Sequence, residues 1–154
     1  CVICQIEYAK MLIKQNSTNI QAFKLLLEAG KFASNGYCEL ALAILKNAKN
    51  GVYHNTLTVK MVLDLLYKTS KTGNERSFLI LFSRAFLLGF KSNAKALIDE
   101  MPMNVAALFV KEHCLRHGIL LGKNQKAADK LKLRLKDRQP KKMVEDVIKH
   151  TLIA

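Results

Sequence analysis

Residues 75–102 constrain the fold more than any other part of this sequence. Residues 78–90 include only two polar side chains, so a helix formed there is apolar over most of its circumference. Such a helix must be covered by neighbours on more than one side. Helical spacing places the polar residues of this stretch on a single side, namely Arg76, Ser77, Ser83 and Arg84.

The second half of this segment predicts a shorter amphipathic helix that folds back on the first. We expect Gly89 to end the first helix, because glycine adopts the left-handed conformation that a sharp stop requires. Ser92 or Asn93 is expected to cap the second helix, and Pro102 to close it. Its inner stripe consists of Ala94, Leu97, Ile98 and Met101. The segment therefore predicts an antiparallel helical hairpin.

The rest of the chain repeats this pattern of apolar helices separated by short breaks. About nine helices are expected, at residues 1–14, 19–35, 38–49, 56–71, two within 75–102, then 104–122, 124–139 and 141–153. Gly36 and Pro140 are expected to end the second and eighth helices, and Asn104 to cap the seventh. No segment alternates like a β-strand. We therefore predict one all-α domain over residues 1–154, a right-handed α-solenoid of stacked antiparallel hairpins.

Composition favours a cytoplasmic protein. The chain has 154 residues, 50% of them hydrophobic, which is enough to bury a core. No apolar run approaches the roughly 18 residues of a membrane span, and no signal peptide precedes the first helix. The cysteines are too few and too scattered for a disulfide framework, so we expect buried thiols at Cys1, Cys4, Cys38 and Cys114. Because the sequence begins at Cys1 and not at Met, we expect part of a longer protein.

A net charge of +13 predicts an acidic partner, with nucleic acid first and an acidic protein or membrane surface after it. The alternative is a basic fragment of a longer protein whose overall charge is balanced. Residues 123–142 contain nine positive residues and two negative ones, Asp129 and Asp137, so this stretch supplies +7 of the charge. These candidate nucleic-acid-binding residues are Lys123, Lys126, Lys130, Lys132, Arg134, Lys136, Arg138, Lys141 and Lys142.

Helical spacing orders this basic stretch into a stripe beside an apolar seam. The stripe is Lys123, Lys126, Lys130 and Arg134, the seam is Ala127, Leu131 and Leu135, and Lys132 and Lys136 flank the other edge. A helix seated by such a seam offers its cations to phosphates. The stretch has no aromatic residue, so stacking on bases is not expected. A solvated terminal helix without a ligand is the alternative.

The helices share a junction in which alanine follows glycine five residues later. It occurs three times, as Gly36…Ala41, Gly89…Ala94 and Gly122…Ala127. Small residues there would let two helices cross closely. Together with Leu81-Phe82 and Met101, the middle junction resembles the pentatricopeptide and tetratricopeptide repeat families, which implies an α-solenoid that binds RNA or protein segments. Residues 82–119 are also similar to a family of germ-cell proteins with a PAZ domain, which implies germ-cell RNA regulation.

In pentatricopeptide repeats that read RNA, a polar residue early in the first helix contacts one base. Alignment on the three glycines places Leu27, Ile80 and His113 at that position. Two of these side chains cannot form a hydrogen bond with a base. The sequence therefore argues against a code of one base per repeat.

Other candidate sites are weak. Cys1-x-x-Cys4 and His113-Cys114-x-x-His117 supply zinc-ligand types, but Cys1 and Cys4 lie on a predicted helix far away in the sequence, so no metal is expected. The chain has no phosphate-binding loop, HExxH pair or nucleophile elbow, so we expect no enzyme, no cofactor and no small-molecule substrate. Arg76 and Arg84 are expected to meet carboxylates of adjacent helices or to line a ligand groove.

These observations leave three functions open. The first is a non-enzymatic scaffold that binds a protein partner in a concave groove, within a larger intracellular protein. The second is RNA association through the basic helix, which is sensitive to salt. The third is a closed bundle that packs on a neighbouring domain and needs no ligand. We expect no membrane partner.

Overall fold

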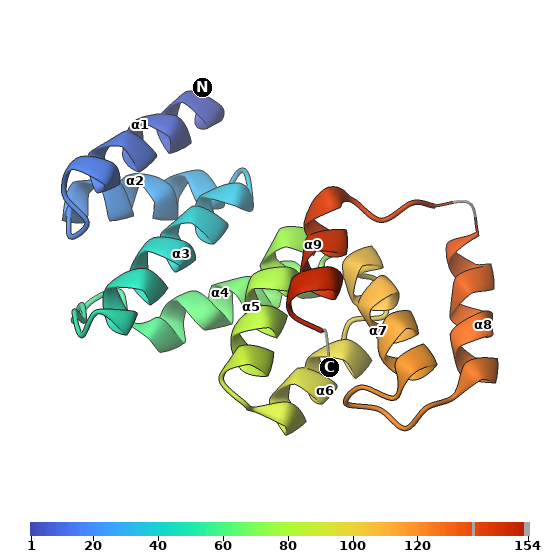
Figure 1. Ribbon diagram of the computed structural model, residues 1–154. Coiled ribbons are helices and arrows are strands. Elements are labelled where there is room, and N and C mark those ends of the chain that lie inside the picture. The colour runs from blue at the N-terminus through green and yellow to red at the C-terminus, as the bar shows by residue number, and fades with distance from the viewer. Residues whose placement is uncertain (137, 153–154) are drawn as a thin grey trace. The chain divides into compact units, whose positions relative to one another are not determined.

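The computed structural model describes residues 1–136 and 138–152, and every regular element in this part is an α-helix (Figure 1). Asp137 and Ile153 of the predicted last two helices lie outside the described residues. The described helices are α1 (Val2–Gln15), α2 (Ile20–Gly30), α3 (Asn35–Lys49), α4 (Val59–Lys71), α5 (Glu75–Leu87), α6 (Lys91–Asp99), α7 (Val105–His117), α8 (Gln125–Leu135) and α9 (Lys142–His150). The predicted all-α class and helix number are confirmed. None of these helices is long and apolar enough to cross a bilayer.

The chain forms two compact units, Cys1–Lys68 and Thr69–Ala154, and α4 runs across the boundary between them. In the first unit α1 packs on α2, α2 packs on α3, and α1 also contacts α3. Large side chains from each helix fill the core between them, including Ile6, Phe23, Leu26, Leu40 and Ile44. Consecutive helices thus bury one another's apolar faces.

In the second unit α5 packs on α6 and α7, α7 packs on α6 and α8, and α9 lies against α5 and α7 (Figure 1). Of the apolar face expected on α5, Phe78, Leu79, Leu81, Phe82 and Ala85 are buried, whereas Phe86 is only partly buried. The Phe78 and Phe82 rings stack with their centroids 5.6 Å apart. Because α5 contacts three other helices, its apolar residues are covered on several sides.

Ser77 departs from the prediction that placed it on the polar side of α5. The residue is fully buried, and its hydroxyl accepts a hydrogen bond from Thr69 Oγ1 at 2.7 Å. Its backbone N–H donates to the side chain of Asn74, which caps α5. Because these groups have partners, a polar residue is tolerated in the interior. Arg76 and Arg84 are partly exposed.

The prediction that Gly36 ends the second helix is wrong. α2 ends at Gly30, and Gly36 lies in the first turn of α3. A Cβ atom at Gly36 would lie 2.7 Å from the backbone nitrogen of Gly30 and 2.8 Å from the carbonyl oxygen of Leu26. The two helices therefore approach to backbone contact at a place where only glycine fits.

Several other helix ends also differ from the prediction. α7 ends at His117 and not at Gly122, because Gly118 takes the left-handed conformation (φ +68°) and caps it. α6 begins at Lys91 with Phe90 at its N-cap position, so neither Ser92 nor Asn93 caps it. α4 begins three residues late, at Val59, because the Thr58 hydroxyl accepts from the Met61 N–H. α8 ends at Leu135, well before Pro140.

The stop after α5 is confirmed. α5 ends at Leu87, and Gly89 follows with φ +81°. Asn104 caps α7 as predicted, with its Oδ1 accepting from the Ala107 N–H at 3.2 Å. Both signals are local, so sequence spacing alone was sufficient to find them.

Candidate nucleic-acid interface

The loop between α7 and α8 fixes where the basic helix begins. The side chain of Asn124 accepts a hydrogen bond from the Ala127 N–H at 3.0 Å and so caps α8. The backbone N–H of Asn124 donates to the carbonyl of Leu115 at 2.8 Å. The start of α8 is thus tied to α7 by a backbone bond and a side-chain cap.

An apolar seam seats α8 on α7. Leu131 and Leu135 are buried as predicted, and Ala128 is fully buried although we did not include it in the seam. Ala128 and Leu131 form one cluster with Leu115 of α7, and Ala127 packs at its edge. The seam is therefore centred nearer Ala128 than Ala127, and the opposite side of α8 is left to solvent.

The acidic residue of α8 is engaged by α7. Asp129 pairs with Arg116 at 3.1 Å, and Arg116 also binds Glu112 one turn earlier in α7, at 2.6 Å. The hydrogen bond to Glu112, and then that to Asp129, raise the pKa of Arg116 above its usual value. Asp129 is thus paired with a cation of α7, although its side chain is still 59% exposed.

The structure divides the nine candidate basic residues into two groups. Lys126, Lys130, Lys132 and Arg134 lie on α8, and Lys136 follows it at the C-terminal end. Lys123 precedes the helix, while Arg138, Lys141 and Lys142 lie beyond it. All nine are exposed. We name the first five residues, which α8 itself presents, the basic face of α8.

Lys141 has a different role from the basic face. Its ammonium group lies 2.8 Å from the carboxylate of Glu75, at the first turn of α5. Within residues 1–136 and 138–152, it is the only one of the nine with a carboxylate partner. The basic face therefore remains available for an external anion, whereas Lys141 holds the beginning of α9.

Leu133 is a feature of this surface that the sequence reading missed. It is 72% exposed although it lies on the helix between two leucines of the buried seam. With Asp129, Lys132 and Lys136 it lines an open hollow of about 600 Å³. Its position outside the seam follows from helical spacing, so the same helical projection that found the stripe could have found it.

The remaining predicted positions lie outside this face. Arg76 and Arg84 are on α5, in different turns of the helix. Leu27, Ile80 and His113 are partly buried on α2, α5 and α7. Burial, and then the neighbouring His117, lower the pKa of His113, although Glu112 opposes this shift. His113 is thus biased toward its neutral form.

The predicted cysteine environments are half right. Cys38 and Cys114 are buried, but Cys1 and Cys4 are exposed at the start of α1, where the Cys1 sulfur accepts from the Cys4 N–H at 3.3 Å. Burial raises the pKa of Cys114 to about 12, which keeps it a thiol. The described residues contain no cluster of three or more ligand side chains suited to a metal.

We therefore expect a thiol reagent to modify Cys1 and Cys4 in the native protein while Cys38 and Cys114 stay protected. Mass spectrometry of the digested, alkylated protein would locate the label. All four cysteines should react after denaturation, which serves as the control. Labelling of Cys114 as fast as Cys4 would contradict the buried environment described for it.

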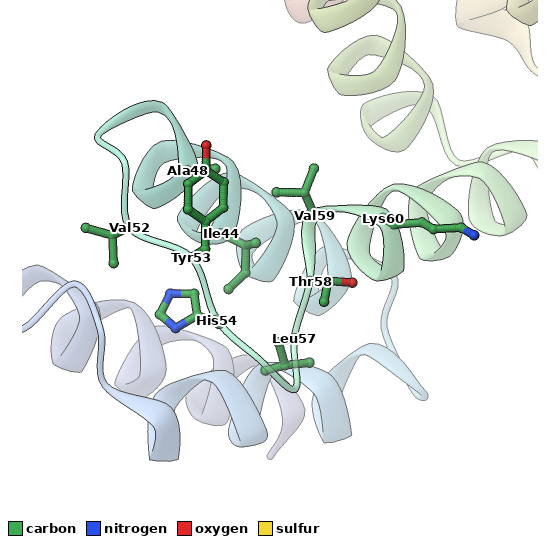
Figure 2. Close-up of a pocket in the computed structure, with 9 residues that line it drawn as sticks. All are labelled: Ile44, Ala48, Val52, Tyr53, His54, Leu57, Thr58, Val59 and Lys60. Carbon is green, nitrogen blue, oxygen red and sulfur yellow. The ribbon is translucent and has the colours of Figure 1, made fainter.

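A cavity of about 280 Å³ lies in the first unit, between α3 and the loop before α4 (Figure 2). Figure 2 shows that its lining comes from α3, from the loop, and from the first turn of α4. The residues are Ile44, Ala48, Val52, Tyr53, His54, Leu57, Thr58, Val59 and Lys60. This lining is mostly apolar, and its polar members are Tyr53, His54, Thr58 and Lys60.

One wall of this cavity is fixed by a hydrogen-bond chain. The Asn47 amide nitrogen donates to the Ser17 carbonyl at 2.7 Å and lies 3.1 Å from Nε2 of His54. Since that nitrogen can only donate, Nε2 must accept, which places the proton of a neutral His54 on Nδ1. The His54 ring also packs edge-on against Phe23, with centroids 5.0 Å apart. The chain thereby orders the loop over the first unit's core.

Compared with known proteins, the chain matches no family model, no curated protein and no solved structure.

Proposed function

We propose that this chain is a non-enzymatic helical interaction module that holds the phosphate backbone of RNA on the basic face of α8. In this proposal the helices of each unit stack as hairpins of a right-handed α-solenoid, and the protein acts in the cytoplasm. The observation that carries the proposal is the basic face itself, which is exposed opposite a buried seam. An acidic polymer would neutralise charges that the described part of the protein leaves without carboxylate partners.

The chemistry of the face favours contact with phosphates over contact with bases. Ammonium and guanidinium groups bind phosphate oxygens, and such contacts release counterions whatever the sequence. Neither the face nor residues 123–142 include an aromatic side chain on which a base could stack. The seam and the Arg116–Asp129 pair hold α8 on α7, so its cations come from a fixed helix. Binding that tolerates many sequences is expected.

The test is binding of a fluorescent single-stranded RNA across a salt series. We expect wild-type affinity to fall linearly with salt on logarithmic axes, and Lys130→Glu with Arg134→Glu to abolish binding near physiological salt. The milder Lys130→Gln with Arg134→Gln removes two charges without adding repulsion. It should reduce the slope by about 1.4, because each phosphate contact on a single strand contributes about 0.7.

A matched control separates the face from net charge. Lys46 and Lys49 are also exposed and lie in the last turn of a helix, α3. Lys46→Glu with Lys49→Glu changes the total charge by the same amount and should leave most of the affinity. Equal losses in the two double variants, or equally weak binding in all proteins, would contradict RNA binding by α8.

A second candidate function is the scaffolding of a protein partner. It is favoured by the way α9 occupies the surface between α5 and α7.

A further inference from the structure

The last helix lies where a separate helix could dock. α9 packs against both α5 and α7, which also contact each other (Figure 1). We call the surface of α5 and α7 that α9 covers the groove. The chain reaches α9 from the end of α8 through residues 136–141, which form no helix in the described part. α9 is thus a short helix placed across two longer ones.

The side of α9 that faces the groove is narrow. Val144 and the following Leu152 are fully buried, while Met143, Val147 and Ile148 are only partly buried. The remaining residues of the helix are exposed and charged or polar, including Glu145, Asp146, Lys149 and His150. α9 therefore has the form of an amphipathic ligand helix, with Val144 as its buried residue, in contrast to α5, which has buried residues in each of its turns from Ser77 to Ala85.

The groove also has a charged end. The Glu75 side chain is only 14% exposed, and its carboxylate binds the 65% exposed ammonium group of Lys141 at 2.8 Å. A recessed acid of this kind favours an occupant that carries a cation just before its first helical turn. Lys141 holds that position, immediately before α9 and three residues before the buried Val144.

We propose that the groove between α5 and α7 is a docking site for an amphipathic helix of a partner protein, and that α9 closes it when the partner is absent. The partner helix carries apolar residues at the spacing of Val144, Val147 and Ile148, with a cation to meet Glu75. This inference deepens the scaffolding function and does not depend on RNA binding by α8.

The length of α9 explains why a partner can replace it. α9 spans nine residues, and isolated helices shorter than about 12–15 residues are marginal in water. α9 is therefore helical because the groove holds it. A longer partner helix is already more helical in water, so it loses less conformational entropy per residue on docking, and it covers more of α5 and α7. Displacement requires that α9 opens without unfolding of the helices beneath it.

The test uses the full chain and a synthetic peptide of residues 141–152 with blocked ends. Val144→Asp places a charge in the buried seam and should release α9 from the groove. The labelled peptide should then bind this variant at least about tenfold more tightly than wild type, in which the tethered α9 competes at high effective concentration. His150→Asp, an equivalent change at an exposed position of the same helix, should behave as wild type.

Two further measurements make the result decisive. A peptide with Lys141→Glu should bind Val144→Asp several-fold more weakly, because it meets Glu75 with a like charge. Hydrogen exchange should show α5 and α7 still protected in Val144→Asp, with protection lost in α9. Loss of protection throughout α5 and α7, or no gain in peptide affinity, would overturn the proposal. A wild-type dimer formed by exchange of α9 would assign the groove to a second copy and overturn it too.

Discussion

Replacement of Asn104 by alanine is expected to destabilise the second unit by roughly 2–4 kcal/mol. Asn104 is fully buried, and its side chain makes three hydrogen bonds. Its Oδ1 accepts from the Ala107 N–H at 3.2 Å, while its amide nitrogen donates to the carbonyls of Ser70 at 3.0 Å and Asn74 at 2.9 Å. One side chain thus joins the end of α4, the cap of α5 and the first turn of α7.

The size of this effect follows from what the alanine leaves behind. The Ser70 and Asn74 carbonyls each keep a backbone donor, from the N–H of Gly73 at 3.0 Å and of Phe78 at 3.3 Å. Each therefore loses its second hydrogen bond, which is worth about 0.5–1.5 kcal/mol. Two such bonds are lost here, and the first turn of α7 loses its cap, which contributes about 1 kcal/mol more. A polar side chain removed from the surface would have none of these consequences.

An aspartate at the same position separates the cap from the other bonds. Asn104→Asp keeps an oxygen for the Ala107 N–H but brings only acceptors to the two carbonyls, so it should destabilise at least as much as alanine. Asn124→Asp is the matched control, because exposed Asn124 caps α8 only by accepting, and aspartate caps equally well. It should change stability by less than about 0.5 kcal/mol.

Urea unfolding followed by circular dichroism, with hydrogen exchange to assign the second unit, measures these differences. The expected order of destabilisation is Asn104→Asp and Asn104→Ala far above Asn124→Asp. If Asn104→Asp were as stable as wild type, the two long-range bonds would contribute nothing and Asn104 would be a simple cap.

Asn104 makes one contact that the sequence predicted and two that it did not. Its role as a cap was predicted, because a cap joins residues three apart and depends only on local spacing. Its bonds to Ser70 and Asn74 join residues 34 and 30 positions apart, and no periodicity in the sequence indicates them. The burial of Ser77 was missed for the same reason, since its partner Thr69 belongs to a different helix.

In the candidate sites, too, features within one helix could be predicted, whereas contacts between helices could not. The basic face and its seam could be predicted, because both repeat with the period of a single helix. The pairing of Asp129 with Arg116, and of Lys141 with Glu75, could not, because each joins two helices whose contact the sequence does not specify. Charge composition therefore located the surface, while the fold decided which cations on it have partners.

The second large effect on stability is expected at Gly36, one of the three glycines that alanine follows five residues later; the other two are Gly89 and Gly122. Gly36→Ala is expected to destabilise the first unit by about 2–4 kcal/mol, although alanine in place of glycine normally stabilises a helix by about 1 kcal/mol. The added Cβ would lie 2.7 and 2.8 Å from backbone atoms of α2, which cannot move aside as a side chain can. α2 and α3 would have to separate, with loss of contact along their shared core.

The other two glycines are controls for the reason behind this effect. Gly89 has open space around it but φ +81°, so Gly89→Ala should cost about 1–2 kcal/mol through backbone strain alone. Gly122 has neither a close neighbour nor a positive φ, so alanine there should change stability by less than about 0.5 kcal/mol. Urea unfolding of the three variants should therefore rank Gly36 above Gly89, and Gly89 above Gly122. Equal effects would mean that the shared pattern, and not the close crossing of α2 and α3, determines the role of these glycines.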